Sequence, residues 1–454
     1  MLLFYLQFTQ EVKYLFVYEH CRHGARSPIF SPDSTYTDEY GTKWFGDGEL
    51  TSIGMRMHHV LGIRNRLKYS GLYSPNFNSK EIIITSSNSN RTMNSIQAQL
   101  FGMFPPGTGE IFQEEEIKYS YPPNKLSDET KAEVDKLGVN VINGRVPLIP
   151  IHNFDLTKNY VFLNEPSICP NMKQYIEELK QKSTLQTFLE KINNTYGEEL
   201  QAYFKKPNRT FIFDMNVILS ITDNFISNVD NGKDLSKFKE ETKIDMDAFY
   251  KMAVELKNIF LYQLKVDKKT SILTSTPYFR DILIWMKNRI DLDKEGKSDH
   301  INYTMPKMVI HSGHDTSVGP IEFFMNTVFD TEYKYVAFAS NIFFELFKDD
   351  NNNYKVSYLV DDELMLTINF EDFAEKIEKV LWSEEEIINF CGIKKNTEDN
   401  ESLLQTLLIL TIVFGSTTLL LLISTIFLYF WMKHKESKRE LEVKKASLIP
   451  EISK

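Results

Sequence analysis

Cysteine is scarce in this chain of 454 residues, which contains only three. They are far apart in the sequence and form no Cys-x-x-Cys pair, which excludes a zinc ribbon and a dithiol redox motif. At most one disulfide can form. In an oxidising compartment we expect it between Cys169 and Cys391, because Cys21 lies within a motif of different chemistry.

Positive charge is also short in the main part of the chain. The sequence has 52 Lys and Arg against 62 Asp and Glu, and residues 433–454 hold seven of the basic and four of the acidic side chains. Since residues 403–432 carry no charge, residues 1–402 have 45 basic and 58 acidic side chains, a net charge of −13. An acidic body argues against nonspecific nucleic acid binding, because neutralising backbone phosphates requires a basic surface.

The overall proportions are those of a globular protein. With 42% hydrophobic and 25% charged residues, the chain is neither disordered nor collagen-like. Its length suits one large catalytic unit of two lobes with additional segments, and it is sufficient to bury a sizeable core.

The uncharged run at residues 403–432 is the exception to these proportions. Its most apolar part, residues 407–431, is long enough to cross a hydrocarbon core of roughly 30 Å as a tilted helix. Tyr429 and Trp431 at its end, followed by a group of Lys and Arg, are typical of a membrane interface with a positive cytosolic flank. We therefore predict one transmembrane helix at 403–432, a short basic cytosolic tail at 433–454, and a body that is lumenal or extracellular. The protein would be a single-pass type I membrane protein with the lipid bilayer as a partner.

This orientation requires an N-terminal signal. Residues 1–12 begin with an apolar stretch that lacks a basic region, so they are either part of a signal segment or a strand that enters the fold. Four of the five Asn-x-Ser/Thr sequons agree with a glycosylated, lumenal body in a lysosome-like compartment, and they begin at Asn193, Asn208, Asn302 and Asn400.

Short β-branched and aromatic runs at 14–20, 82–86 and 307–311 predict three buried strands, each followed by a polar or glycine-containing turn. Between the first two, residues 54–69 are helical in composition and follow Thr51-Ser52, a typical helix cap. This order indicates a parallel βαβ unit. A second helix is predicted from Arg91 to about Gly102.

The remaining periodicity places helices between the sheet segments. Residues 125–300 are mostly helical by their apolar spacing, notably 184–196, 246–264 and 277–290, and residues 335–348 and 354–366 form a predicted strand pair. The expected fold is α/β, with a three-layer sheet core and an inserted, mainly α-helical cap at roughly 125–300. The catalytic domain would span residues 13–400.

The first predicted strand leads directly into Arg22-His23-Gly24-Ala25-Arg26. In an α/β sheet, ligands bind beyond the carboxyl ends of the strands. Gly24 allows the backbone to approach an anion closely, and the two guanidiniums can each bind two phosphate oxygens.

Two further strands end in compatible residues. The third leads into Gly313-His314-Asp315, which provides a donor and a carboxyl group able to protonate a leaving oxygen. Arg91 follows the second strand and adds a guanidinium at the same edge. His311 is better interpreted as a packed strand residue than as a catalyst.

These segments together resemble the histidine acid phosphatases, branch 2 of the histidine phosphatase superfamily, with the lysosomal and prostatic type as the nearest. The resemblance covers about residues 12–390 and is carried by RHGARSP at 22–28, GELTSIGMRMHHVLG at 48–62, Arg91-Thr92, GHDTS at 313–317 and FASNIFFEL at 338–346. It implies His23 as a nucleophile that forms a phosphohistidine and Asp315 as the general acid. It implies a phosphate clamp made of Arg22, Arg26, Arg91 and His314.

The chemistry of the residues agrees with that assignment. Phosphoryl transfer mainly requires positioning and neutralisation of charge, which arginines can supply, so we expect neither a metal nor a cofactor. A neutral imidazole can attack phosphorus and divide hydrolysis into two steps. We therefore predict an acid phosphatase acting on phosphomonoester substrates.

Two alternatives remain. A phytase or inositol-polyphosphate phosphatase would require a strongly basic pocket, whereas this body is acidic, and a catalytically inactive membrane-anchored binding protein would have lost His23 or Asp315. The sequence leaves homodimer formation open.

Overall fold

The computed structural model describes residues 13–29, 35–38, 40–153, 169–180, 183–204, 215–264, 268–295, 305–393 and 433. The chain divides into a compact unit, Met1–Gly392, and a C-terminal unit, Ile393–Lys454. Every helix and strand with described bounds lies in the first unit.

Among the described residues of this unit, a mixed sheet of seven strands forms the centre, in the order β5-β4-β6-β1-β7-β8-β9. Strand β1 pairs in parallel with β6 and antiparallel with β7, so it joins a parallel half of the sheet to an antiparallel half. The strands are β1 (Lys13–Arg22), β4 (Ile82–Ser86), β5 (His152–Asn153), β6 (Met308–Gly313), β7 (Asn341–Lys348), β8 (Tyr354–Val360) and β9 (Glu363–Asn369), and a separate pair is formed by β2 (Thr35–Thr37) and β3 (Lys43–Phe45).

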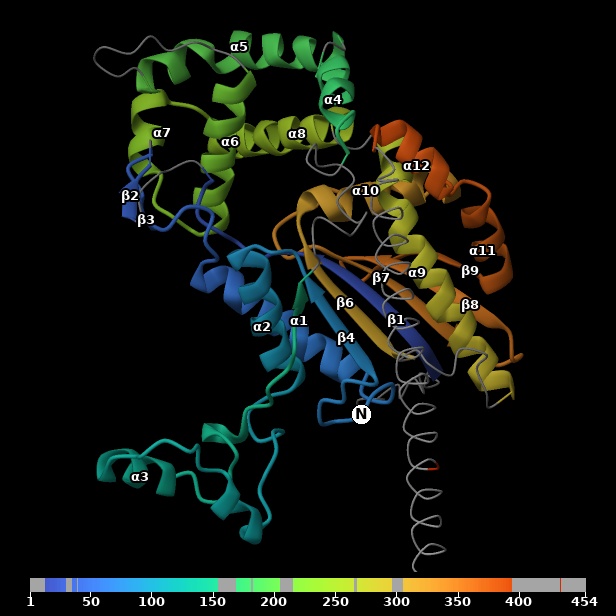
Figure 1. Ribbon diagram of the computed structural model, residues 1–454. Helices are drawn as coiled ribbons and strands as arrows, with labels where there is room; N and C mark the ends of the chain where they lie inside the picture. The colour runs from blue at the N-terminus through green and yellow to red at the C-terminus, as the bar shows by residue number, and fades with distance from the viewer. Residues whose placement is uncertain are drawn as a thin grey trace, which may run out of the picture. The chain divides into compact units, whose positions relative to one another are not determined.

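Helices cover both faces of the sheet, which gives the three layers predicted from the sequence (Figure 1). Alternate side chains of β1 point to opposite faces, as strand geometry requires. Phe16 and Tyr18 pack with the helices α9 (Lys268–Glu295) and α10 (Asp315–Phe329), whereas Val17 packs with α2 (Asn90–Met103). Helix α1 (Ser52–Lys68) packs against α2, and Thr51 caps it by accepting a hydrogen bond from the Gly54 amide, as predicted.

The predicted helical insertion has a core of its own. Aromatic and aliphatic side chains of four helices, among them Phe188, Phe225, Phe238 and Phe249, are buried together. The helices between the parallel strands β5 and β6 are α4 (Met172–Lys180), α5 (Ser183–Phe204), α6 (Met215–Asp230), α7 (Ser236–Thr242), α8 (Met246–Leu264) and α9. Since α9 packs on the sheet, the cap among the described residues consists of α4 to α8.

The remaining helices lie before the cap and after the sheet. An arm between α2 and β5 contains α3 (Asp128–Asp135) and the 3-10 helices η1 (Glu114–Tyr119) and η2 (Asn143–Arg145). Helices α11 (Phe370–Glu378) and α12 (Glu384–Cys391) follow β9.

Two strand boundaries differ from the sequence prediction. The run predicted at 354–366 is divided into β8 and β9 by Asp361 and Asp362, which both adopt positive φ angles, 49° and 66°. Two such residues form the tight turn that joins twisted antiparallel strands. The run predicted from residue 335 becomes a strand only at Asn341, because the backbone turns at Ala339, with φ 62°.

The expected disulfide between Cys169 and Cys391 is present, and it joins the segment before α4 to the end of α12. Cys21 is free and buried. The predicted transmembrane segment at 403–432 lies outside the described residues. Within the described part of the chain, no helix combines the length and the hydropathy needed to cross a membrane.

Candidate active site

The carboxyl ends of three parallel strands bring the predicted site residues together. In the register of the sheet, Arg22 at the end of β1 lies opposite Gly313 of β6, and Ser86 at the end of β4 lies opposite Ser312. The loops that leave these strands therefore meet at one edge. The sequence predicted this edge correctly, because parallel strands end on the same side.

Gly24 is needed for the close approach of the first loop to helix α1. A Cβ atom at Gly24 would lie 2.4 Å from the carbonyl oxygen of Gly54, and a Cβ at Gly54 would lie 2.2 Å from that of Ala25. Any side chain there would push the loop away from the helix. The amide of Gly24 also donates a hydrogen bond to Ser95 Oγ at 3.0 Å, which fixes the loop to α2.

Arg22 and Asp315 form an ion pair that is largely buried. The side chain of Arg22 is fully buried, and its Nη2 lies 3.0 Å from Asp315 Oδ2 while its Nη1 donates to the Val336 carbonyl at 2.8 Å. Burial alone would raise the pKa of Asp315, but the charges of Arg22 and Lys257 outweigh it and hold that pKa well below its usual range. Asp315 is therefore a carboxylate in this state of the site.

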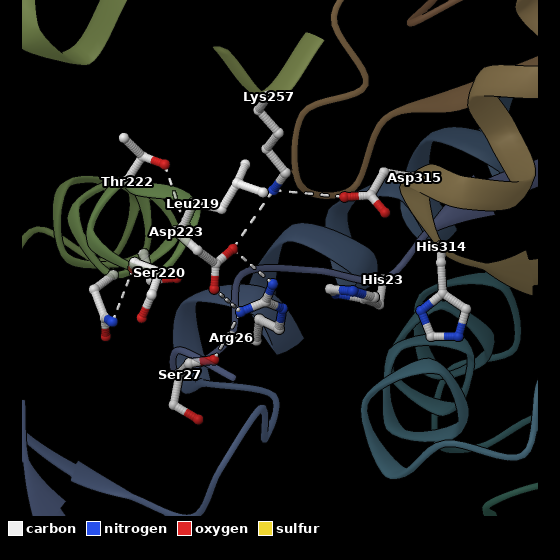
Figure 2. A network of polar contacts seen from close by, with 12 residues as sticks. His23, Arg26, Ser27, Leu219, Ser220, Thr222, Asp223, Lys257, His314 and Asp315 are labelled. Atoms are coloured by element: carbon white, nitrogen blue, oxygen red, sulfur yellow. Dashed lines mark hydrogen bonds and ion pairs between the residues drawn. The ribbon is translucent and has the colours of Figure 1, made fainter. Parts of the chain in front are cut away.

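Arg26 is held by a carboxylate from the cap. Its two terminal nitrogens donate to the two oxygens of Asp223 in helix α6, at 3.1 and 3.0 Å, which is the forked geometry favoured by guanidinium and carboxylate. Lys257 of α8 lies 3.7 Å from Asp223 and 3.5 Å from Asp315 (Figure 2). Despite burial, the charges of Arg26 and Lys257 lower the pKa of Asp223 to about 2.

His23 is neutral, and one of its nitrogens has a defined proton. Burial, followed by the nearby charges of Arg22 and Arg26, lowers the pKa of His23 well below its usual value. Its Nδ1 lies 2.9 Å from the carbonyl oxygen of Gly24, which can only accept, so Nδ1 carries the hydrogen. The other nitrogen, Nε2, then has the free electron pair that a nucleophile requires.

His314 contacts Arg91 and Ser87. Arg91 Nη2 lies 3.5 Å from His314 Nδ1, and His314 Nε2 lies 2.8 Å from Ser87 Oγ. A guanidinium only donates, so Nδ1 is the acceptor and Nε2 carries the hydrogen. Burial, then the charge of Arg91, lowers the pKa of His314 to about 3, and this second histidine is also neutral. Its ring centre lies 5.5 Å from that of His23.

His311 is a packed strand residue, as predicted. It is 1% exposed within β6 and bonds to Thr85 Oγ1 at 2.9 Å. Its ring lies against that of His20, with 4.3 Å between the centres. The two residues are paired in the register of the neighbouring strands β1 and β6.

Three contributors were missed by the sequence analysis: Asp223, Lys257 and Phe338. The Phe338 ring lies 4.2 Å from the Arg22 guanidinium, and at 5.6 and 5.7 Å from the charged groups of Arg26 and Lys257. Phe338 belongs to a segment that carried the resemblance, but no role was given to it. Asp223 and Lys257 belong to cap helices whose sequences contain no motif. In such a helix, a charged residue is expected to lie on the solvent-exposed face.

The arrangement can bind and transfer an anionic group. Arg22, Arg26, Arg91 and Lys257 supply positive charge around a neutral imidazole, and Asp315 provides a carboxyl group at the same place. Among the described residues, no group of three or more His, Cys, Asp or Glu is arranged to hold a metal ion.

Comparisons with known proteins bear on the family of the chain. The family model described as histidine phosphatase superfamily (branch 2) matches residues 6–361. The lysosomal acid phosphatase of Rattus norvegicus is 24% identical over 431 residues, which are 91% of this chain and 87% of the relative. That of Homo sapiens is 22% identical and covers 74% and 67%.

A solved phytase structure from Klebsiella sp. superposes with a TM-score of 0.52 at 15% sequence identity, covering 82% of this chain and 96% of that one. At this identity the likeness concerns the fold alone. Because the family model spans most of the sequence, the chain belongs to branch 2 of the histidine phosphatase superfamily, as the resemblance of its motifs predicted.

Proposed function

We propose that the protein is a membrane-anchored acid phosphatase that hydrolyses phosphate monoesters through a phosphohistidine at His23. The observation that carries the proposal is the neutral His23 ring, whose Nε2 has a free electron pair and which is surrounded by guanidiniums. Its similarity to lysosomal acid phosphatases supports the same substrate class.

In the first step, Nε2 of His23 attacks phosphorus and the bond to the ester oxygen breaks. The electron pair goes to the leaving oxygen, which takes a proton from Asp315. In the second step, water attacks phosphorus, its proton goes to Asp315, and the electron pair of the phosphorus–nitrogen bond returns to His23. Arg22, Arg26 and Arg91 stabilise the charge on the phosphoryl oxygens in both steps.

Asp315 must be protonated to begin this cycle, although its pKa in the structure is low. A bound phosphate pairs with Arg22, so less of the positive charge of Arg22 acts on Asp315. The phosphate is also negative itself, and both effects raise the pKa of the Asp315 carboxyl. An acidic pH optimum follows, because the required proton is more available at low pH. This agrees with a lysosome-like lumen.

The charge of the site favours a monoester over an inositol polyphosphate, the second candidate. Four cations, Arg22, Arg26, Arg91 and Lys257, lie with two carboxylates, which leaves two positive charges among these six groups. Two charges match one phosphate dianion. A polyphosphate would need further cations.

The test is hydrolysis of p-nitrophenyl phosphate by the full-length chain in detergent, from pH 3 to 9 with EDTA present. We expect activity with an optimum below pH 7, no activity from His23→Ala, and unchanged activity from His152→Ala, an exposed histidine on β5. Radiolabelled phosphate should be trapped on the wild type but not on His23→Ala. Full activity in His23→Ala would refute the assignment, and a strong preference for phytate would favour the second candidate.

We also propose that residues 403–432 span the membrane and that the catalytic body is lumenal. The uncharged run with its basic flank supports this, and so does the exposed sequon at Asn193, in helix α5. In sealed microsomes, a protease should remove only the basic tail, and Asn193→Gln should reduce the mass lost on deglycosylation. Digestion of the catalytic body in intact vesicles would contradict this topology.

A further inference from the structure

Lys257 is a largely buried cation that enters the site from the cap. Its side chain is 13% exposed, and its ammonium lies 3.5 Å from Asp315 Oδ2 and 3.7 Å from Asp223 Oδ1, on opposite sides (Figure 2). Neither contact has the geometry of a hydrogen bond, so the ammonium acts on both carboxylates through its charge. Its three donor hydrogens are thus not committed to either partner.

The position of Lys257 is fixed by what surrounds it. The Phe338 ring lies 5.7 Å from the ammonium, within the range of a cation–π contact. Asp223 holds Lys257 and also forks onto Arg26, so one carboxylate from α6 anchors two cations. Lys257 is therefore the link in a row of alternating charges that runs from Arg26 through Asp223 to Asp315.

The charged and titratable groups around Asp315 come from several elements. The pKa of its carboxyl group is lowered by the nearby cations and raised by the acidic groups. The groups are Arg22, His23 and Arg26 from β1 and its loop, Arg91 from α2, Lys257 from α8, His314 beside it and Tyr335 before β7, with Asp223 of α6 on the other side of Lys257.

Two of these cations contact the Asp315 carboxylate, and they differ in what they do. Arg22 is also hydrogen bonded to the Val336 carbonyl and is part of the clamp that binds the phosphoryl group. Lys257 has no such second task among its described contacts. Its charge adds to the positive charge of the site, but it can be changed while Arg22, Arg26 and Arg91 all remain in place.

We propose that Lys257 is a positioning residue that sets the acidity of Asp315, and thereby the pH above which the enzyme no longer protonates its leaving group. The inference rests on the proposed role of Asp315 as general acid. A positive charge beside this carboxyl stabilises its ionised form, so the acid gives up its proton readily but holds it only at low pH. Asp223 limits this effect, because its negative charge offsets part of the charge of Lys257.

The test is the pH dependence of kcat on an alkyl phosphate, glycerol phosphate, whose leaving group needs a proton. The falling limb is the part of the kcat–pH profile where kcat decreases as the pH rises. In Lys257→Met, this limb should move to higher pH by about one unit or more, the scale on which a neighbouring charge shifts a carboxyl pKa. In Asp223→Asn, the limb should move to lower pH, since Lys257 then acts on Asp315 without compensation. Lys257→Arg keeps the charge and should keep the wild-type limb.

Lys251→Met is the matched control, because it removes an exposed lysine from the same helix and should leave the profile unchanged. An unshifted limb in Lys257→Met, or a loss of activity that is equal at every pH, would overturn the inference. If Lys257→Met fails to fold, the pH profile of Asp223→Asn is the test. A falling limb of that variant that stays in place or moves to higher pH would refute the role of Lys257. Activity in the wild type and its absence in His23→Ala would still support the proposed function. The role of Lys257 and the proposed function can therefore fail separately.

Discussion

Replacing Asp315 by Asn should slow alkyl esters far more than aryl esters. Asn has nearly the shape of Asp and keeps an oxygen close to Arg22 Nη2, which lies 3.0 Å from Asp315 Oδ2 in the ion pair, so the geometry of the site should persist. What is lost is the proton for the leaving group. General acid catalysis contributes about 10²- to 10⁴-fold, equivalent to about 3 to 5 kcal/mol of the barrier. Nitrophenolate leaves without protonation, so the loss of rate on p-nitrophenyl phosphate should be much smaller.

The same substitution should tighten the binding of inorganic phosphate. The Asp315 carboxylate repels a phosphate dianion and engages the charge of the fully buried Arg22. Removing it should lower the inhibition constant of phosphate by roughly tenfold, which is the size of one such charge interaction. A variant that merely damaged the site would bind phosphate more weakly, so the direction of this change separates the two explanations.

The assay compares kcat/KM for glycerol phosphate and p-nitrophenyl phosphate in wild type and variant at one acidic pH, with phosphate inhibition measured alongside. Asp330→Asn, an exposed residue after the same helix α10 with φ 56°, is the control and should change neither ratio. An equal loss on both esters would show that Asp315 is not the acid.

Three further predictions concern stability. Removing the disulfide with Cys169→Ser and Cys391→Ser opens a loop of 222 residues, and chain entropy predicts a loss of about 5 kcal/mol in unfolding free energy, while an unchanged urea midpoint would contradict this. Burial raises the pKa of Glu322 to about 8, so its native form holds a proton that the unfolded chain releases from about pH 4.5 upward. Its folded pKa is the higher one, and its stabilising contribution is complete below pH 4.5 and lost as the pH rises toward 8. The unfolding free energy of Glu322→Gln relative to wild type should therefore increase by up to about 1.4 kcal/mol per pH unit in that window, and a constant difference in urea titrations would refute it. Gly24→Ala should cost about 1 to 3 kcal/mol through overpacking against the Gly54 backbone, whereas Gly71→Ala, with nothing within 4 Å of the new atom, should be tolerated in the same thermal melts.

Local patterns were sufficient for most of the sheet. The strands around residues 14–20, 82–86 and 307–311 and the helix after Thr51 lie where their composition placed them, because apolar spacing and caps act over a few residues. The turn at Asp361 and Asp362 was missed, since aspartates at positive φ are not signalled as strongly as glycine.

The sequence by itself determined the strand ends and therefore the predicted residues of the site. His23, Arg91 and Asp315 each follow a strand, and parallel strands end at one edge, so their meeting needed no knowledge of distances. The scarcity of cysteine also left one disulfide to expect, and that disulfide formed.

Only the tertiary structure decided which groups complete the site and which protons they carry. Asp223 reaches Arg26 across 197 positions of the chain, through a cap helix whose sequence carries no motif. Lys257 reaches Asp315 in the same way. The neutral state of His23 and the charged state of Asp315 depend on burial and on charges a few ångströms away. Such distances are fixed by packing between distant segments, and no local pattern in the sequence encodes them.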